Sequence, residues 1–96
     1  MVIGVLQVEL LIDDAMSLKD KRRVVSSLKD RLHREHLVAV AEVDRLDAHR
    51  VAVLGIATVS NSAAHAQGTL DRIVNELRAA RQFSLNDQRS EIISGR

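Results

Sequence analysis

The order in which apolar spacing changes along the chain restricts the fold more than any other feature. Residues 2–12 alternate between apolar and polar positions, which is typical of a strand. Residues 18–35 follow the spacing of a helix, and Ser17 with Asp20 resembles a capping box with Asp in place of Glu. The stripe expected to be buried on this helix consists of Leu18, Val25, Leu28 and Leu32.

The second half of the chain repeats strand and helix patterns. Residues 37–44 and 50–60 are rich in Val, Ile and Ala, and the polar segment 45–49 between them predicts an antiparallel hairpin. A second helix follows, with Asn61 or Ser62 as its N-cap. Its predicted buried stripe consists of Ala66, Leu70, Ile73, Leu77 and Ala80.

The C-terminal segment 85–93 carries the weakest strand pattern, because its residues from Asn86 to Arg89 favour a loop. Whether the chain after Phe83 forms a full strand stays open at this point. The complete order is strand, helix, strand, strand, helix, strand, which predicts a ferredoxin-like βαββαβ fold of the α+β class. We expect residues 1–96 to form one domain, a two-layer sandwich with two helices on one face of an antiparallel sheet.

The composition excludes several classes of protein. Apolar residues make up 46% of the chain but Phe83 is its one aromatic residue, so Val, Leu, Ile and Ala must build the core. Cys is absent from the sequence, which excludes disulfides and thiolate chemistry and fits the cytoplasm. The start lacks the basic flank of a secretory signal, and the uncharged stretch 51–70 is too polar in its second half to span a membrane.

Four stretches of the sequence carry a family resemblance. In chain order they are IGVLQVELLI, SLKDKRRVVSSLKDRL, VAVAEVD and LGIATVSN. Together they resemble the bacterial YlxP-like family, a domain of unknown function, over nearly the whole chain. The resemblance implies a ferredoxin-like fold and a gene that often neighbours those for translation initiation and ribosome maturation factors. It implies no catalytic residues.

The first helix concentrates positive charge. Residues 17–36 hold seven Lys or Arg against three acidic residues, about +4, on a chain whose formal net charge is +1. The candidate RNA-binding residues on its polar face are Lys19, Arg22, Arg23, Lys29, Arg31 and Arg34. Such an array can neutralise phosphates, although Asp20 and Asp30 interrupt it and a merely solvated face is the alternative. Because the strands offer no aromatic side chains for base stacking, contact with RNA would be made to its backbone.

Catalytic and metal-binding patterns find little support. The turn at Asp13 and Asp14 lacks the glycines and the arginine of an acylphosphatase-type anion loop, and no nucleophile is paired with a base, so we expect neither an enzyme nor a cofactor. The predicted topology gathers one acidic group at an end of the sheet, namely Asp13, Asp14, Glu42, Asp44 and Asp47 near His49. Basic residues open the first helix at the same end, which favours a charge-paired network over a metal ion.

Lys21 does not fit the amphipathic pattern of the first helix. It falls inside the stripe that Leu18 and Val25 define, and an isolated buried ammonium is very costly. The second strand ends where this helix begins. We therefore predict that Lys21 lies within charge-pair reach of Glu42 or Asp44 in a structural charge network.

The predicted strands are apolar on both faces. Leu54 and Ile56 alternate with Val53 and Ala57, whereas a sheet covered on one side should have a polar second side. A second copy, a partner protein or simple tolerance of small apolar residues would explain this pattern. We expect a homodimer or higher homo-oligomer. Two hypotheses follow: an accessory protein of translation or ribosome maturation that contacts RNA backbone, or a self-associating interaction or scaffold module with no nucleic-acid or catalytic role.

Overall fold

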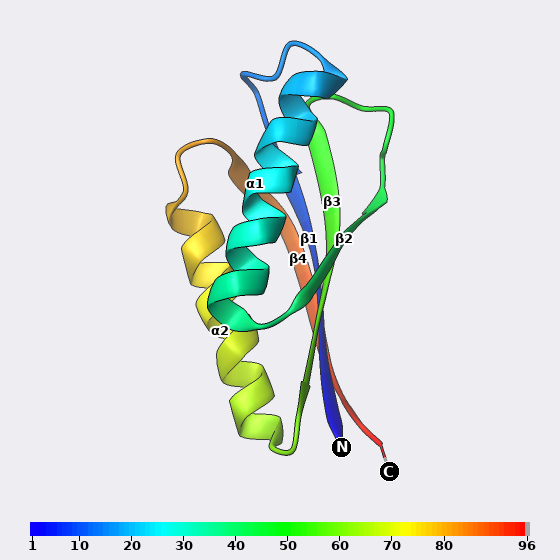
Figure 1. Cartoon of the computed structure of the whole chain (residues 1–96), viewed down its shortest axis with the longest axis vertical. Helices are drawn as coiled ribbons and strands as arrows, with labels where there is room; N and C mark the ends of the chain where they lie inside the picture. The colour runs from blue at the N-terminus through cyan, green and yellow to red at the C-terminus, as the bar shows by residue number, and fades with distance from the viewer. Residues whose placement is uncertain (96) are drawn as a thin grey trace.

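The computed structural model describes residues 1–95 and confirms the predicted order of elements (Figure 1). The strands and helices are β1 (Val2–Leu11), α1 (Leu18–His36), β2 (Ala39–Asp44), β3 (Val51–Ser60), α2 (Ala63–Ala79) and β4 (Ser84–Ser94). The four strands form one sheet in the order β2-β3-β1-β4, and each neighbouring pair is antiparallel. Both helices cover the same face of this sheet, as the ferredoxin-like prediction requires.

Side-chain caps fix where the helices begin. The Ser17 hydroxyl accepts a hydrogen bond from the Asp20 N–H (3.2 Å), and the Asp20 carboxylate accepts one from the Met16 N–H (2.9 Å). The Asp20 carboxylate thus accepts from the N–H of the residue before the N-cap. In a standard capping box, the corresponding side chain accepts from the N–H of the N-cap itself. In α2, Ser62 is the N-cap, because its hydroxyl accepts from the His65 N–H (3.2 Å).

The second strand begins two residues later than predicted. Leu37 ends α1 in the left-handed conformation, with φ of 55°, and its N–H donates to the His33 carbonyl (3.0 Å). This conformation closes the helix and excludes Leu37 from an extended strand. Its side chain is 82% exposed, while the next residue, Val38, is buried in the core.

The core lies between the helices and the sheet and is almost wholly aliphatic. Buried side chains come from each layer, namely Leu6, Val8 and Leu10 of β1, Leu54 and Ile56 of β3, Val25, Leu28 and Leu32 of α1, and Leu70, Ile73 and Leu77 of α2. Phe83 also packs here. Gly4 lets α2 approach β1 closely, since a Cβ at this position would lie 3.1 Å from Thr58 Cγ2 and 3.3 Å from Leu70 Cδ1.

The C-terminal segment forms a full strand along the edge of the sheet, which resolves the question left open by its sequence. The pairing of β4 with β1 shifts between Leu85 opposite Leu10 and Asp87 opposite Glu9, so Asn86 is an extra residue in a bulge. There its side-chain amide donates to the Glu9 carboxylate (2.6 Å). The positions of β4 opposite the buried Val8 and Leu6 are the polar Gln88 and Ser90, so residues 85–93 lack a regular alternation.

The uncharged stretch 51–70 does not form one element. It is divided between β3 and the first half of α2, with a short turn between them. Among the described residues, the helices are too short or too polar to cross a membrane.

Candidate functional site

The outer face of α1 presents five cationic side chains. Lys19, Arg22, Arg23 and Arg34 are exposed and Lys29 is half-buried. Within residues 1–95, no carboxylate oxygen lies within 4.0 Å of any of their charged nitrogens. The first three line a shallow depression together with Ser26, Ser27 and Asp30. The outer face of α1, defined by the five cationic residues, therefore carries cations that form no ion pair within residues 1–95.

Arg31, which was predicted to belong to the basic array, contacts α2 and not the outer face of α1. Its Nε lies 3.3 Å from Glu76 Oε2 on α2, and both side chains are about one-third exposed. Arg31 therefore belongs to the seam between the two helices. Of the six candidate RNA-binding residues, five remain on the outer face of α1.

Lys21 is buried, as its place on the helical wheel predicts, with 1% of its surface exposed. Its ammonium lies 2.7 Å from Glu42 Oε2. It also donates to the carbonyl oxygens of Arg45 (3.0 Å), Leu46 (3.3 Å) and Val51 (3.2 Å). Three N–H donors thus serve three carbonyls, while Glu42 supplies the opposite charge.

The Lys21 contacts join α1 to the hairpin between β2 and β3. The carbonyls belong to the hairpin turn and to the start of β3, and Glu42 lies near the end of β2. Asp44 is not part of this arrangement, because its carboxylate accepts from the Arg45 N–H (2.7 Å). Arg45 itself adopts a left-handed conformation with φ of 55°. The buried ammonium therefore links α1 to the β2–β3 hairpin at this end of the sheet.

The acidic group predicted at the same end is not assembled into one site. Asp13, Asp14 and Asp47 are exposed, and His49 is half-buried. Among residues 1–95, no three ligand atoms at this end lie close enough together to share one ion. Lys21 and Glu42 are the members of the predicted network that meet.

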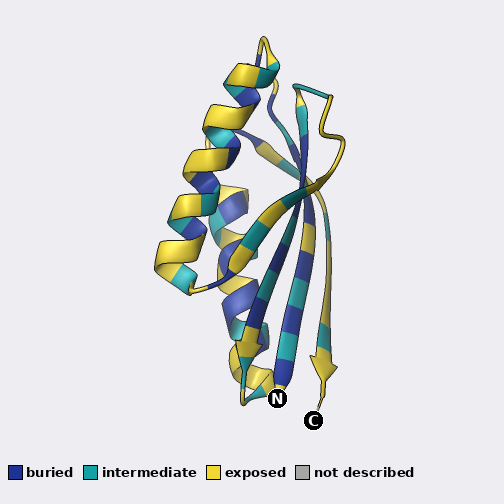
Figure 2. Ribbon diagram, turned by 45° about the vertical axis from the view of Figure 1, so that its right-hand side comes forward, coloured by how far each residue is buried: buried dark blue, intermediate teal, exposed yellow. Residues whose placement is uncertain are grey.

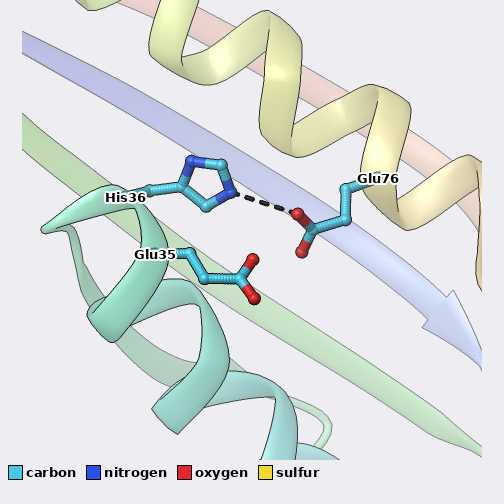
Figure 3. A group of neighbouring side chains, drawn as sticks. All are labelled: Glu35, His36 and Glu76. Carbon is cyan, nitrogen blue, oxygen red and sulfur yellow. Dashed lines mark hydrogen bonds and ion pairs between the residues drawn. The ribbon is translucent and has the colours of Figure 1, made fainter.

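A second polar cluster lies where the end of α1 approaches α2 (Figure 3). One ligand atom from each of Glu35, His36 and Glu76 falls within 4.8 Å of the others. His36 Nε2 is 3.2 Å from Glu76 Oε1, while Arg31 occupies the other Glu76 oxygen. A divalent cation here would compete with the Arg31 guanidinium, so the chemistry of the cluster favours ion pairing. Sequence spacing gave no signal for it, because Glu76 is forty residues from His36.

The open face of the sheet, which the helices leave uncovered, is concave and apolar at its centre. Figure 2 shows that β1 alternates between buried and half-buried residues, and Gln7 is its one exposed position. A hollow of about 730 Å³ lies over the sheet. Its apolar floor and wall include Val5, Ala39, Ala41, Val43, Gly55 and Ala57, and Gln7, Arg89 and Glu91 bound it on the β4 side. Val43 leans over Gly55, where a Cβ would lie 3.0 Å from Val43 Cγ1.

Comparison with known proteins assigns the family. A family model described as "Protein of unknown function (DUF503)" matches residues 3–90. "Uncharacterized protein YlxP" of Bacillus subtilis (strain 168) is 33% identical over 72 residues, which cover 75% of this chain and 78% of that protein. The residues that the family model matches include both helices and all but the last four residues of β4. The YlxP-like resemblance of the sequence is thereby confirmed, and the chain belongs to the DUF503 family.

Proposed function

We propose that this protein contacts the phosphodiester backbone of RNA through the outer face of α1, as a small accessory protein of translation or ribosome maturation. The observation that supports the proposal is the set of five cationic side chains without an acidic partner in residues 1–95. Unpaired Lys and Arg side chains bind phosphates and release the counterions condensed on the nucleic acid. The gene neighbourhood implied by the family resemblance supports the link to translation.

The arrangement favours contact with backbone over reading of sequence. From Lys19 to Arg34 the helix runs about 22 Å at 1.5 Å per residue, which extends along several nucleotides. The sheet carries no aromatic side chain within residues 1–95 on which a base could stack, since Phe83 lies in the core before β4. Affinity should therefore depend on salt and be similar for unrelated RNAs.

The test is a titration of two unrelated single-stranded RNAs at several salt concentrations. If all five cations contact phosphates, the logarithm of the binding constant should fall against the logarithm of salt with a slope of about −3.5. The triple variant K19E/R22E/R23E should bind both RNAs more weakly and reduce the slope to about −1.4. Discrimination between the two RNAs should stay unchanged.

The matched control is R72E/R78E/R81E, which reverses three exposed arginines on α2 and the turn after it. Each triple variant changes the net charge from +1 to −5, because each reversal removes two units of charge. Equal weakening in both variants would show that net charge, and not the outer face of α1, governs binding. Wild-type protein without salt-dependent RNA binding would contradict the proposal outright.

A second candidate function rests on the open face of the sheet. An apolar hollow on an uncovered face is typical of a protein-interaction surface. In this alternative the protein is a self-associating interaction or scaffold module, with no nucleic-acid or catalytic role. Neither proposal assigns a catalytic residue, and a wild-type protein that self-associates but shows no salt-dependent RNA binding would favour the second over the first.

A further inference from the structure

We infer that a second copy of this chain covers the open face of the sheet, in an isologous homodimer in which Arg89 and Glu91 pair with their counterparts across the interface. The inference rests on the second candidate function and specifies the face and the charged residues through which self-association occurs. It does not depend on RNA binding.

The register decides which side chains share the open face. Residues directly opposite each other in an antiparallel sheet lie on the same face. Ala41, Gly55, Gln7 and Arg89 form one row across the four strands, and Ala39, Ala57, Val5 and Glu91 form the next. The β2, β3 and β1 positions of these rows are small or aliphatic except Gln7. Within these two rows charge lies only at the β4 positions, and the row beyond Gln7 adds Glu9 on β1 and Asp87 on β4.

The shape of the face suits a second apolar surface. The hollow over Ala39, Ala41, Gly55 and Ala57 has room for side chains from outside. Around it stand large apolar side chains that are exposed in the single chain, namely Val43 (51% exposed), Val59 (69%) and Ile93 (42%). The face thus offers both a recess and protruding aliphatic side chains. Such a surface is able to complement another copy of itself.

The charges at the β4 edge favour a second copy over a charged partner. Arg89 and Glu91 are two residues apart on the same face, so they carry opposite charges side by side. In an isologous interface, if residue i of one copy contacts residue j of the other copy, then residue j of the first copy also contacts residue i of the second. Two copies can therefore form two Arg89–Glu91 pairs. A polyanion or polycation would gain one of these contacts and be repelled by the other.

The size of the face is adequate for a specific interface. Four strands spaced about 4.8 Å apart and about nine residues long cover about 600 Å² in projection, and side chains increase the accessible area. A standard interface removes about 800 Å² from each partner, about an eighth of the 6024 Å² of accessible surface here. Because both helices lie on the opposite face, dimerisation would leave the outer face of α1 exposed in each copy.

The first test measures the mass of the protein in solution by light scattering and sedimentation at tens of micromolar. Wild type should be a dimer, and Ala41→Glu should be a folded monomer or dissociate at least tenfold more readily. Ala41 is exposed on the edge strand β2, so the single chain can accept the longer side chain. The control is Ala64→Glu, an exposed alanine on α2, which should leave the dimer intact.

The second test exchanges the charges at the β4 edge. Arg89→Glu or Glu91→Arg alone should weaken dimerisation at least tenfold, and the double variant R89E/E91R should restore it to near the wild-type level. Circular dichroism melting of each variant separates loss of the interface from loss of fold. Restoration in the double variant is expected for copies that pair with each other, and a foreign partner would not produce it.

Two results would overturn the inference. One is a wild-type monomer at tens of micromolar, and the other is a dimer that tolerates Ala41→Glu and both single charge reversals. The RNA proposal is tested independently of the dimer. A monomer that retains salt-dependent RNA binding contradicts the dimer alone, and a dimer without RNA binding contradicts the RNA proposal alone.

Discussion

Glu42 and Glu76 each hold a cation of α1, yet the two ends of this helix place them in different surroundings. Glu42 meets Lys21, whose side chain is 1% exposed and is further bonded to three carbonyl oxygens. Glu76 meets Arg31 and His36 in a seam where water reaches the arginine, whose side chain is 38% exposed. The comparison shows that burial determines how much stability is lost when a pair of opposite charges is broken.

Burial determines how well the remaining charge is solvated when one partner of a pair is removed. Water solvates a half-exposed charge that loses its partner, and salt already screens the attraction. The Lys21 ammonium cannot be solvated by water in this way, because α1, β2 and β3 surround it. The Lys21 pair should therefore matter for folding, and the Glu76 pair should adjust how α1 lies against α2.

The largest effect is expected for Glu42→Leu. This change removes the counter-charge of Lys21 but leaves the ammonium buried, which should lower the free energy of unfolding by about 3–5 kcal/mol. Urea denaturation followed by circular dichroism measures it. A loss below about 1 kcal/mol would show that the three carbonyls alone hold the ammonium, and the comparison of the two ends would then fail.

Lys21→Met should cost less, about 1–3 kcal/mol. Methionine fills a similar volume, Glu42 is 17% exposed and can be hydrated, and the turn carbonyls lie near solvent. The double variant K21M/E42L should lose less than the sum of the two single changes, because replacing a buried pair by apolar residues is often nearly neutral. Additive losses in urea denaturation would contradict a direct coupling between the two residues.

Glu76→Gln should have the smallest effect, about 0.3–1 kcal/mol at low salt. Most of this difference from wild type should disappear in 1 M NaCl, where charges are screened within about 3 Å. Glu42→Gln provides the matched control, since the same chemical change at the buried pair should remain costly at high salt. Equal salt sensitivity of the two variants would remove the distinction drawn from their burial.

The Lys21 position shows how far sequence reasoning reached. A lysine within an apolar stripe is costly unless paired, and the element order brings the start of α1 close to the end of β2. Those two arguments predict a contact with Glu42 or Asp44, and the structure selects Glu42. Asp44 could not be distinguished in advance, because a bulge between Glu42 and Asp44 changes the register of β2 there.

Other features depended on contacts between distant residues. The Arg31–Glu76 pair and the Asn86–Glu9 bond link segments forty-five and seventy-seven residues apart, so local patterns carry no trace of them. Arg31 accordingly looked equivalent to Arg34 on a helical wheel. The strand β4 was hidden mainly because Gln88 and Ser90, which lie opposite the buried Val8 and Leu6, are polar, and the extra residue Asn86 also shifts the pattern by one position.

The order of the elements, the aliphatic core and the basic helix follow from apolar periodicity and local capping, which act over a few residues and are visible in the amino-acid sequence. The same periodicity places one cation of this helix, Lys21, in the core. Tertiary contacts determine which cations of α1 form ion pairs within residues 1–95, which glutamate neutralises Lys21, and how the open face forms a hollow with opposite charges along one edge. Those properties depend on register and on the approach of α1 to α2, which are set by packing across the whole chain.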